Sequence, residues 1–138
     1  MNGNQTGFRR LEVWQLGREL ANQVFTTTKS FPKDEAFGLT SQLRRASVSI
    51  PSNIAEGWAR QSDGAFANHL RIARASLSEV HTQLILANDF GYLTCNQLRA
   101  IEPSIDTLGR KLYHLLERLT ASHVREEVAS YTAGVSES

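Results

Sequence analysis

Two long stretches of the chain carry apolar residues at alternating spacings of three and four, and this pattern constrains the fold most strongly. The first stripe consists of Phe66, Leu70, Ala73, Leu77, Val80, Leu84 and Ala87. The second consists of Leu98, Ile101, Ile105, Leu108, Leu112, Leu115 and Leu119. Such spacing places every member of a stripe on one side of an α-helix, as in helices that pack lengthwise on one another. The pattern predicts two long amphipathic helices.

Two further helices are predicted in the first half of the chain. Residues 11–29 follow helical spacing, and Phe31-Pro32 ends that segment because proline pushes the preceding residue out of the α region. The next helix is expected over residues 34–60, since the carboxylates of Asp34 and Glu35 suit the positive end of a helix.

Local signals also mark the ends of the two long helices. Ser62 is the expected N-cap of the third helix, because its hydroxyl can accept a backbone N–H. Gly91 can take the left-handed conformation that ends that helix. Thr94 and Gln97, three residues apart, have the spacing of a capping box for the fourth helix.

Four helices with short connections and no strand signal predict an all-α fold, an antiparallel up-down-up-down four-helix bundle. The bundle is expected to span residues 11–120. Residues 1–10 are expected to be a flexible N-terminal segment, and residues 121–138 a disordered tail, because the apolar period fades after Ser122.

The stretch Gln42–Arg60 is unusual for a helix. Its inward stripe contains small and polar residues and is crossed by Pro51; it consists of Leu43, Ala46, Ile50, Asn53 and Gly57. An interior proline typically costs ~3 kcal/mol. Because the apolar phase continues across Pro51, one bent helix is favoured over two separate helices.

Several polar residues in this stretch are interpreted as structural. A hydroxyl of Ser47, Ser49 or Ser52 could satisfy the carbonyl that Pro51 leaves unpaired. Asn53 is expected to satisfy a buried backbone group, with that same carbonyl as a candidate. Small residues, including Gly57, permit close helix approach. Glu56 is assigned to the scaffold rather than to an active site, and so are Pro51, Asn53 and Gly57.

The composition fits one domain without a membrane segment. The chain has 138 residues, and no apolar run approaches the ~18–20 residues of a membrane-spanning helix. The N-terminus lacks the apolar region of a signal peptide, and the single Cys95 agrees with a reducing, cytoplasmic location. With 15 basic and 14 acidic side chains, the net charge is +1, so any surface for nucleic acid must be local.

Catalytic patterns are weak, and the sequence predicts a protein that is not an enzyme, with no metal site and no cofactor. The Glu-x-x-His motif of di-iron bundles is absent; His114-x-x-Glu117 is reversed and occurs once. Arg118 and His123 have the Arg-x4–6-His spacing of some helical ribonucleases, which leaves ribonuclease activity as a remote alternative. Cys95 has no neighbouring histidine to act as a base.

Basic residues suggest a binding role instead. If the second and third helices are antiparallel neighbours, five arginines could form one local surface for phosphates: Arg44, Arg45, Arg60, Arg71 and Arg74. The alternative is salt bridging, since Glu56–Arg60 and Asp106–Arg110 have i,i+4 spacing.

Apolar residues beyond the four stripes predict self-association. They are more numerous than one narrow seam can bury, and they comprise Trp14, Leu16, Leu20, Trp58, Ile85, Leu86 and Leu116. A bundle with apolar residues outside its inner face often covers them with another subunit.

The order of several motifs resembles a known family. The motifs are Phe8, Leu11-Glu12-Val13-Trp14-Gln15, Phe31-Pro32, Glu35, Phe37-Gly38-Leu39, Gln42-Leu43-Arg44-Arg45-Ala46, Ser49-Ile50, Asn53-Ile54-Ala55-Glu56-Gly57, Phe66, Leu70, Ile72-Ala73, Ser76-Leu77, Glu79 and Gly91-Tyr92. Over about residues 8–119 the chain resembles the four-helix bundle proteins encoded by intervening sequences in bacterial 23S ribosomal RNA genes. It is more distantly similar to the accessory variability determinant proteins of diversity-generating retroelements.

The resemblance implies a cytoplasmic helical bundle that assembles as a ring, a homopentamer. For the accessory proteins it implies binding of nucleic acid and reverse transcriptase through a basic surface, and it brings no catalytic residues. Together, the residues and the resemblance predict a non-catalytic homo-oligomer that binds structured RNA or DNA through its arginines. The main alternative is a protein-binding scaffold whose arginines pair with acids across subunits.

Overall fold

The computed structural model describes the backbone of residues 7–137 and the side chains in that range other than 122–124, 126 and 134–137. Its elements in chain order are η1 (Gly7–Arg10), α1 (Glu12–Thr28), η2 (Lys33–Glu35), α2 (Leu39–Ala59), α3 (Asp63–Asp89) and α4 (Cys95–Glu137), where η denotes a 3-10 helix. No strand occurs in residues 7–137, which confirms the all-α class. The four α-helices correspond to the four predicted segments, whereas the two 3-10 helices were not predicted.

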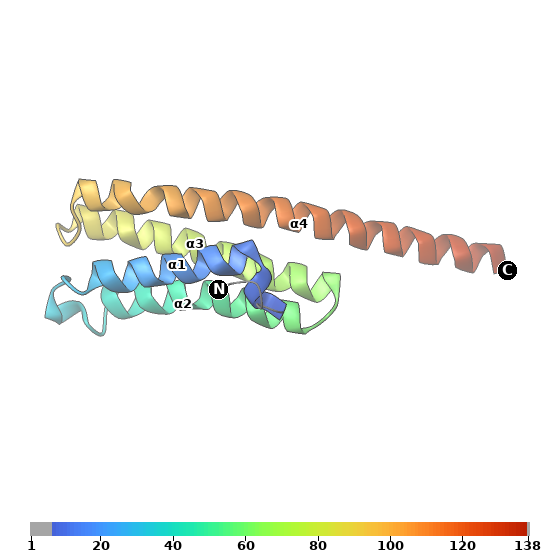
Figure 1. Ribbon diagram of the computed structural model, residues 1–138, viewed down its shortest axis with the longest axis horizontal. Helices are drawn as coiled ribbons and strands as arrows, with labels where there is room; N and C mark the ends of the chain where they lie inside the picture. Colours follow the sequence, from blue (N-terminus) through green and yellow to red (C-terminus); the bar gives the residue numbers. More distant parts are fainter. Residues whose placement is uncertain (1–6, 138) are drawn as a thin grey trace.

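The four α-helices lie lengthwise beside one another (Figure 1). The α1–α2 and α3–α4 connections lie at one end of the molecule, and the α2–α3 connection lies at the other. Helix α2 packs on α1 and α3, while α4 packs on α3 and α1. The α2–α3 contact is the most extensive of these and the α1–α4 contact the least.

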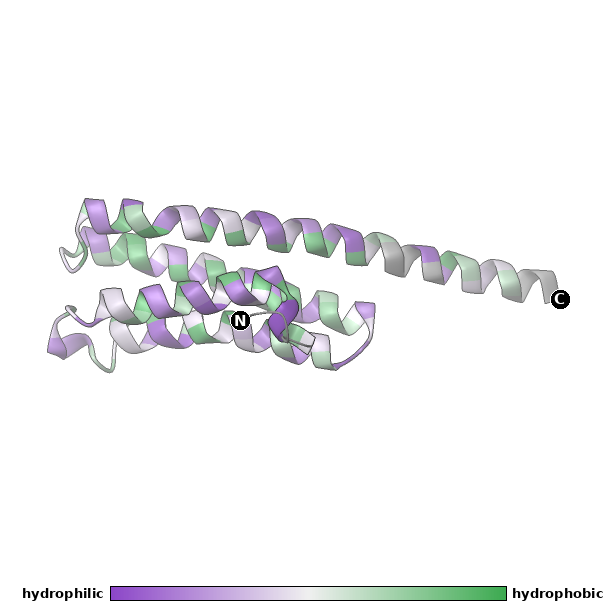
Figure 2. Ribbon diagram, in the orientation of Figure 1, coloured by the Kyte–Doolittle hydropathy of each residue, from purple (hydrophilic) through white to green (hydrophobic). Residues whose placement is uncertain are grey.

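The core consists of the side chains that the apolar stripes place inward. All seven stripe residues from Phe66 to Ala87 are buried. In α4 the stripe is buried from Ile101 to Leu112, and Leu116 is buried while Leu115 and Leu119 are only partly so. Hydrophobic and hydrophilic residues alternate along each helix, as one-sided burial requires (Figure 2). Complete burial of a leucine contributes about 1.5–3 kcal/mol.

The predicted helix ends are confirmed by their hydrogen bonds. Ser62 Oγ accepts the backbone N–H of Ala65 at the start of α3. Thr94 and Gln97 form a reciprocal capping box, with bonds of 2.9 and 3.1 Å between each backbone N–H and the other side chain. Gly91 has a φ of 81°, and the N–H groups of residues 91 and 92 return to carbonyls of the last turn of α3.

The start of the second helix differs from the prediction. The chain forms η2 over Lys33–Glu35, and α2 begins only at Leu39 rather than at Asp34. Between them, Gly38 adopts φ −109° and ψ −117°, which is outside the helical region, and Phe37 is 99% exposed. Glycine tolerates such a conformation, so the helical path is interrupted there.

Helix α2 continues through Pro51, as the favoured interpretation predicted. The predicted role of the serine hydroxyls is wrong. The carbonyl that loses its partner is that of Ser47, four residues before the proline. The hydroxyls of Ser47, Ser49 and Ser52 donate instead to the carbonyls of residues 44, 46 and 48.

Both ends of the chain are more helical than expected in the described residues. Gly7–Arg10 forms η1, and the Phe8 ring lies 5.1 Å from the Trp14 ring, so this part of the N-terminal segment is packed. Helix α4 continues through Glu137, although residues 121–138 were expected to be a disordered tail. A helix forms its backbone hydrogen bonds within itself and needs no tertiary partner for them. The loss of apolar periodicity after residue 122 therefore does not by itself end the helix. This last part of α4 projects beyond the other helices (Figure 1).

Candidate nucleic-acid interface

Two of the five predicted arginines lie on α2, and one of them turns toward α1. Arg44 Nε donates to Thr28 Oγ1 at 2.9 Å, and its guanidinium carbon lies 4.6 Å from the centre of the Phe25 ring. Arg44 is therefore half-buried and holds α1 against α2. Arg45 is exposed and donates to Ser41 Oγ one turn earlier.

Arg60 forms the salt bridge that its spacing predicts. Its guanidinium lies 3.4 Å from the Glu56 carboxylate, and both side chains are more than half exposed. Glu56 is thus a surface partner of Arg60 on α2. The equally spaced pair Asp106–Arg110 forms no ion pair in the described part of the chain.

Arg71 and Arg74 lie on α3, on the side that faces α4. They line a groove of about 880 Å³ between the two helices. Its α4 side is formed by Tyr113, Leu116, Glu117, Thr120, Ala121 and Arg125. We call this the α3–α4 groove. Since Arg44 contacts α1 and Arg74 contacts α4, the five predicted arginines do not form one continuous patch.

Tyr113 is the aromatic residue of the α3–α4 groove. Its side chain is 46% exposed, and the guanidinium carbon of Arg74 lies 5.2 Å from the ring centre. A hydrogen bond with the Glu117 carboxylate, together with the charge of that carboxylate, raises the pKa of the Tyr113 hydroxyl above its ordinary value of 10.0. The hydroxyl therefore stays protonated, and the Arg74 guanidinium lies over the face of the ring.

The arginines of the groove have few polar partners. Arg71 donates to the Asn68 side chain at 3.1 Å, and Arg125 donates to the Ala121 carbonyl at 3.3 Å. Among the described residues, none of Arg71, Arg74 and Arg125 lies within salt-bridge distance of a carboxylate.

Sequence reasoning missed Tyr113 and Arg125 as groove residues. Arg125 falls in the segment that was expected to be a disordered tail, and Tyr113 lies beside the buried stripe of α4 rather than on it. The i,i+4 spacing of Tyr113 and Glu117 is visible in the sequence. The sequence does not show how α3 is aligned with α4. The structure shows this alignment, for example in the 2.8 Å contact between His81 Nε2 and Glu102 Oε2.

The unusual stretch of α2 forms a close contact with α3. A Cβ atom added to Gly57 would lie 2.6 Å from His69 Cβ, so only glycine fits there. Asn53 Nδ2 donates to the Ser49 carbonyl at 2.8 Å, and its Oδ1 lies 3.2 Å from His69 Nδ1. Asn53 thus bonds a backbone group, as predicted, but not the carbonyl that the proline frees. Ser49 Oγ lies 2.6 Å from Ser76 Oγ on α3.

Gly17 makes a similar contact that sequence reasoning did not single out. It is buried in α1, and an added Cβ would lie 3.2 Å from Ile50 Cγ2 and 3.5 Å from the backbone nitrogen of Pro51. Pro51 of α2 is therefore covered directly by α1.

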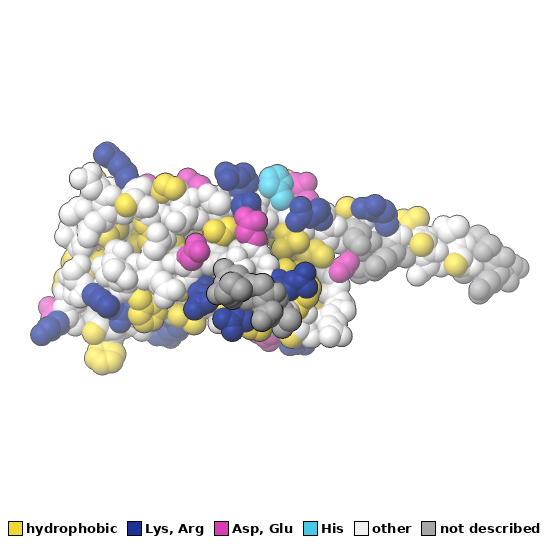
Figure 3. All heavy atoms as spheres, viewed as in Figure 1, with side chains coloured by type: hydrophobic (Ala, Val, Ile, Leu, Met, Phe, Trp, Pro, Cys, Tyr) yellow, Lys and Arg dark blue, Asp and Glu magenta, His cyan; other side chains and the backbone are white. Residues whose placement is uncertain are grey.

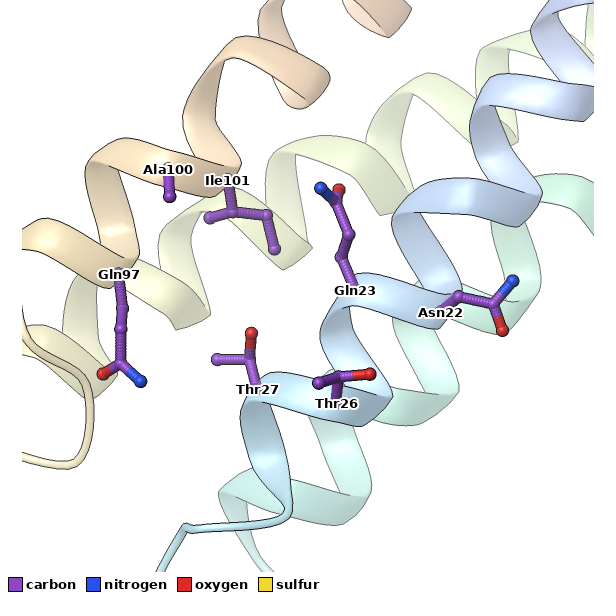
Figure 4. A pocket seen from close by; sticks show the side chains of 7 residues that line it. All are labelled: Asn22, Gln23, Thr26, Thr27, Gln97, Ala100 and Ile101. Atoms are coloured by element: carbon purple, nitrogen blue, oxygen red, sulfur yellow. The ribbon is translucent and has the colours of Figure 1, made fainter.

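A second groove lies between α1 and α4, near the α3–α4 connection (Figure 4). It has a volume of about 350 Å³ and is lined by Asn22, Gln23, Thr26, Thr27, Gln97, Ala100 and Ile101. Gln23 and Ile101 point into the space between the helices. Gln23 Oε1 is buried and has no hydrogen-bond partner among the described residues. The lining has amides and hydroxyls, which can donate hydrogen bonds to a phosphate, but it has no cation to balance the phosphate charge.

The apolar residues expected to drive self-association divide into two groups. Leu20 is fully buried, Leu116 is 7% exposed, and Trp14 and Leu16 pack against the core. Trp58, Ile85 and Leu86 remain about two-fifths exposed. Further exposed apolar side chains that were not predicted include Phe25, Phe37, Val48, Ile72 and Phe90.

The remaining reactive residues are dispersed. Among the described residues, no three His, Cys, Asp or Glu side chains are grouped so that they could hold a metal ion. Arg118 lies with His114 in a hollow between α1 and α4 that the Glu12–Lys111 ion pair also lines. The side chain of His123 lies outside the described residues, so the structure gives no distance between the side chains of Arg118 and His123.

No helix in the described part of the chain is long and apolar enough to cross a membrane. Lys and Arg side chains are scattered over the face seen in Figure 3, with Asp and Glu between them. This distribution agrees with a net charge of only +1. Any attraction for nucleic acid therefore depends on a local group of cations.

Comparison with known proteins places the chain in a family. One similar solved structure is a protein of unknown function from the S23 ribosomal protein family of Bacteroides thetaiotaomicron VPI-5482. It is 26% identical, with a TM-score of 0.70, and the match covers 75% of this chain and 97% of that one. None of the curated proteins matches the chain. The family model described as 23S rRNA-intervening sequence protein matches residues 9–114. Because that match covers most of the chain and the helical structure agrees, the chain belongs to the 23S rRNA-intervening sequence protein family.

Proposed function

We propose that this chain is a non-catalytic RNA- or DNA-binding protein whose main phosphate contacts come from the α3–α4 groove. The observation that carries the proposal is that Arg71, Arg74 and Arg125 line one groove and form no ion pair with a carboxylate among the described residues. Arginine forms paired hydrogen bonds with phosphate, and unpaired guanidiniums pay no cost of breaking an existing ion pair. Membership of a family whose name refers to 23S rRNA supports RNA as the first ligand to test.

The groove replaces the five-arginine patch as the proposed contact surface. Arg71 and Arg74 remain in it, and Arg125 is added. Arg44 is assigned to the α1–α2 contact because its guanidinium already binds Thr28 and covers Phe25. Arg45 and Arg60 stay on the surface of α2, where they can add weak, long-range attraction.

The test is RNA binding measured by fluorescence anisotropy over about 50–200 mM salt. Each phosphate contact contributes about 0.7–0.9 to the slope of log affinity against log salt concentration. The double variant Arg71→Ala with Arg74→Ala is therefore expected to weaken binding and to reduce the slope by about 1.5.

The matched control is Arg45→Ala with Arg60→Ala, which removes the same charge from exposed positions outside the groove. It is expected to keep a slope close to that of the wild type. Equal losses in the two double variants would indicate a general charge effect and contradict the groove. The absence of binding at the lowest salt concentration would refute the proposal as a whole.

The proposal includes assembly into a homo-oligomer of up-down-up-down bundles, in a ring of five. It is supported by the exposed apolar residues Trp58, Val48 and Ile72 on α2 and α3. Light scattering is expected to give about five times the chain mass of 15.4 kDa.

The scaffold alternative predicts that the Arg71 and Arg74 substitutions alter this mass while RNA binding stays at background. The enzyme alternative requires that labelled RNA be cleaved and that His123→Ala abolish the cleavage.

A further inference from the structure

The α3–α4 groove combines cations with an exposed aromatic ring and an apolar floor. Leu116 is 7% exposed at the base, while Tyr113 is 46% exposed above it. Arg71, Arg74 and Arg125 line the same space. A surface that contacted only phosphates would have no need of the ring or of the apolar floor.

Duplex nucleic acid offers little to such a groove. Its bases are stacked on one another, and it presents sugars and phosphates to a protein surface. An unpaired nucleotide presents an anionic phosphate and also a planar base with two free faces. Tyrosine rings and guanidinium planes both stack on unpaired bases, and this stacking tolerates any base identity.

We infer that the α3–α4 groove binds a short unpaired segment of single-stranded nucleic acid, with one base against Tyr113 and Arg74 and phosphates of the segment on Arg71 and Arg125. This inference rests on the proposed function and narrows its ligand from nucleic acid in general to a single strand. The groove volume of about 880 Å³ is within the ~300–1,000 Å³ of small-molecule sites, so a nucleotide can enter it.

Glu117 adds one negative charge to this site. It raises the pKa of the Tyr113 hydroxyl, so the hydroxyl stays protonated. It also lowers the local positive charge and thereby disfavours a second phosphate close to the ring.

The experiment compares one fluorescent RNA strand of about ten nucleotides, a length that covers one such site, with the same strand annealed to its complement. The wild type is expected to bind the single strand at least about tenfold more tightly than the duplex. Tyr113→Leu keeps an apolar side chain but removes the ring, so single-strand affinity is expected to fall by about ten- to a hundredfold. Duplex affinity and the salt slope are expected to stay unchanged.

Tyr113→Phe is the matched variant, because it keeps the ring and loses only the hydroxyl. It is expected to retain most of the single-strand affinity. Circular dichroism and light scattering on the same samples check that fold and mass are preserved. A change of mass in Tyr113→Leu would show that the groove is a protein contact and would overturn the inference.

Two other results separate this inference from the proposed function. Equal affinity for single strand and duplex, or an unchanged single-strand affinity in Tyr113→Leu, overturns the inference while nucleic-acid binding stands. Absence of binding to both probes at low salt overturns the proposed function, and the inference with it.

Discussion

Replacing Gly57 with alanine tests the tightest helix contact in the molecule. The added Cβ would lie 2.6 Å from His69 Cβ and 3.1 Å from Phe66 Cδ1. Carbon atoms in ordinary contact are ~3.5–4.0 Å apart, so α2 and α3 must separate by about 1 Å. Rotation of a side chain cannot relieve this clash, because the backbone fixes the position of each Cβ atom.

The expected loss of stability follows from three contributions. Overpacking of this kind costs about 1–3 kcal/mol. Separation of the helices also stretches the Asn53–His69 and Ser49–Ser76 hydrogen bonds, each of which contributes about 1 kcal/mol. Alanine returns about 1 kcal/mol through its higher helix propensity. The free energy of unfolding should therefore fall by about 2–4 kcal/mol.

The assay is urea unfolding followed by circular dichroism, at one protein concentration because assembly would affect the midpoint. Gly109→Ala is the control, since its added Cβ would meet only Leu77 Cδ2, at an ordinary 3.5 Å. That variant should be unchanged or up to about 1 kcal/mol more stable. If Gly57→Ala were as stable as Gly109→Ala, the close approach of α2 and α3 would be wrong.

Two further substitutions test individual interactions. Asn53→Leu removes the hydrogen bonds to the Ser49 carbonyl and to His69. We expect the free energy of unfolding in urea to fall by about 1–3 kcal/mol and the oligomer mass in light scattering to be more broadly distributed. An unchanged unfolding midpoint and an unchanged mass would contradict the structural role of this amide. Glu117→Gln removes the negative charge that raises the pKa of Tyr113, so in an ultraviolet titration one tyrosine should ionise at lower pH than in the wild type. Because the raised pKa favours the protonated hydroxyl in the folded state, its small stabilising effect is complete below the unfolded pKa and is lost as the pH rises through the folded pKa. Identical titration curves for the two proteins would show that Glu117 does not contact the hydroxyl.

Features determined by neighbouring residues could be predicted from the sequence. The Ser62 cap, the Thr94–Gln97 box and the left-handed Gly91 each depend on a few adjacent residues, and each is present. Continuity of α2 through Pro51 could also be predicted, because the apolar phase on both sides of the proline belongs to one helix. The break at Gly38 was missed. Asp34 and Glu35 resemble the acidic first turn of a long helix, but the same residues can begin a short 3-10 helix that ends before Gly38.

The composition of the candidate site could not be predicted in this way. Arg44 and Arg74 are both near apolar stripes, yet Arg44 turns toward α1 and Arg74 toward α4. The direction of each arginine side chain depends on the rotation of its helix about the helix axis and on which neighbouring helix covers each side. Arg125 was assigned to a disordered tail because apolar periodicity was used as the criterion for helix, and a helix that projects into solvent does not need it.

The contrast between the two contacts of α3 explains where a ligand can enter. Toward α2, Gly57, Ser49 and Ser76 bring the backbones close together, and the hollow beside Gly57 has a volume of only about 260 Å³. Toward α4, Tyr113 and Arg74 are too large for such an approach, so their side chains line an open groove. The groove holds three arginines and one glutamate, although the whole chain has a net charge of only +1. The proposed function therefore requires that an anionic strand be attracted by local contacts in this groove rather than by a general field of the protein.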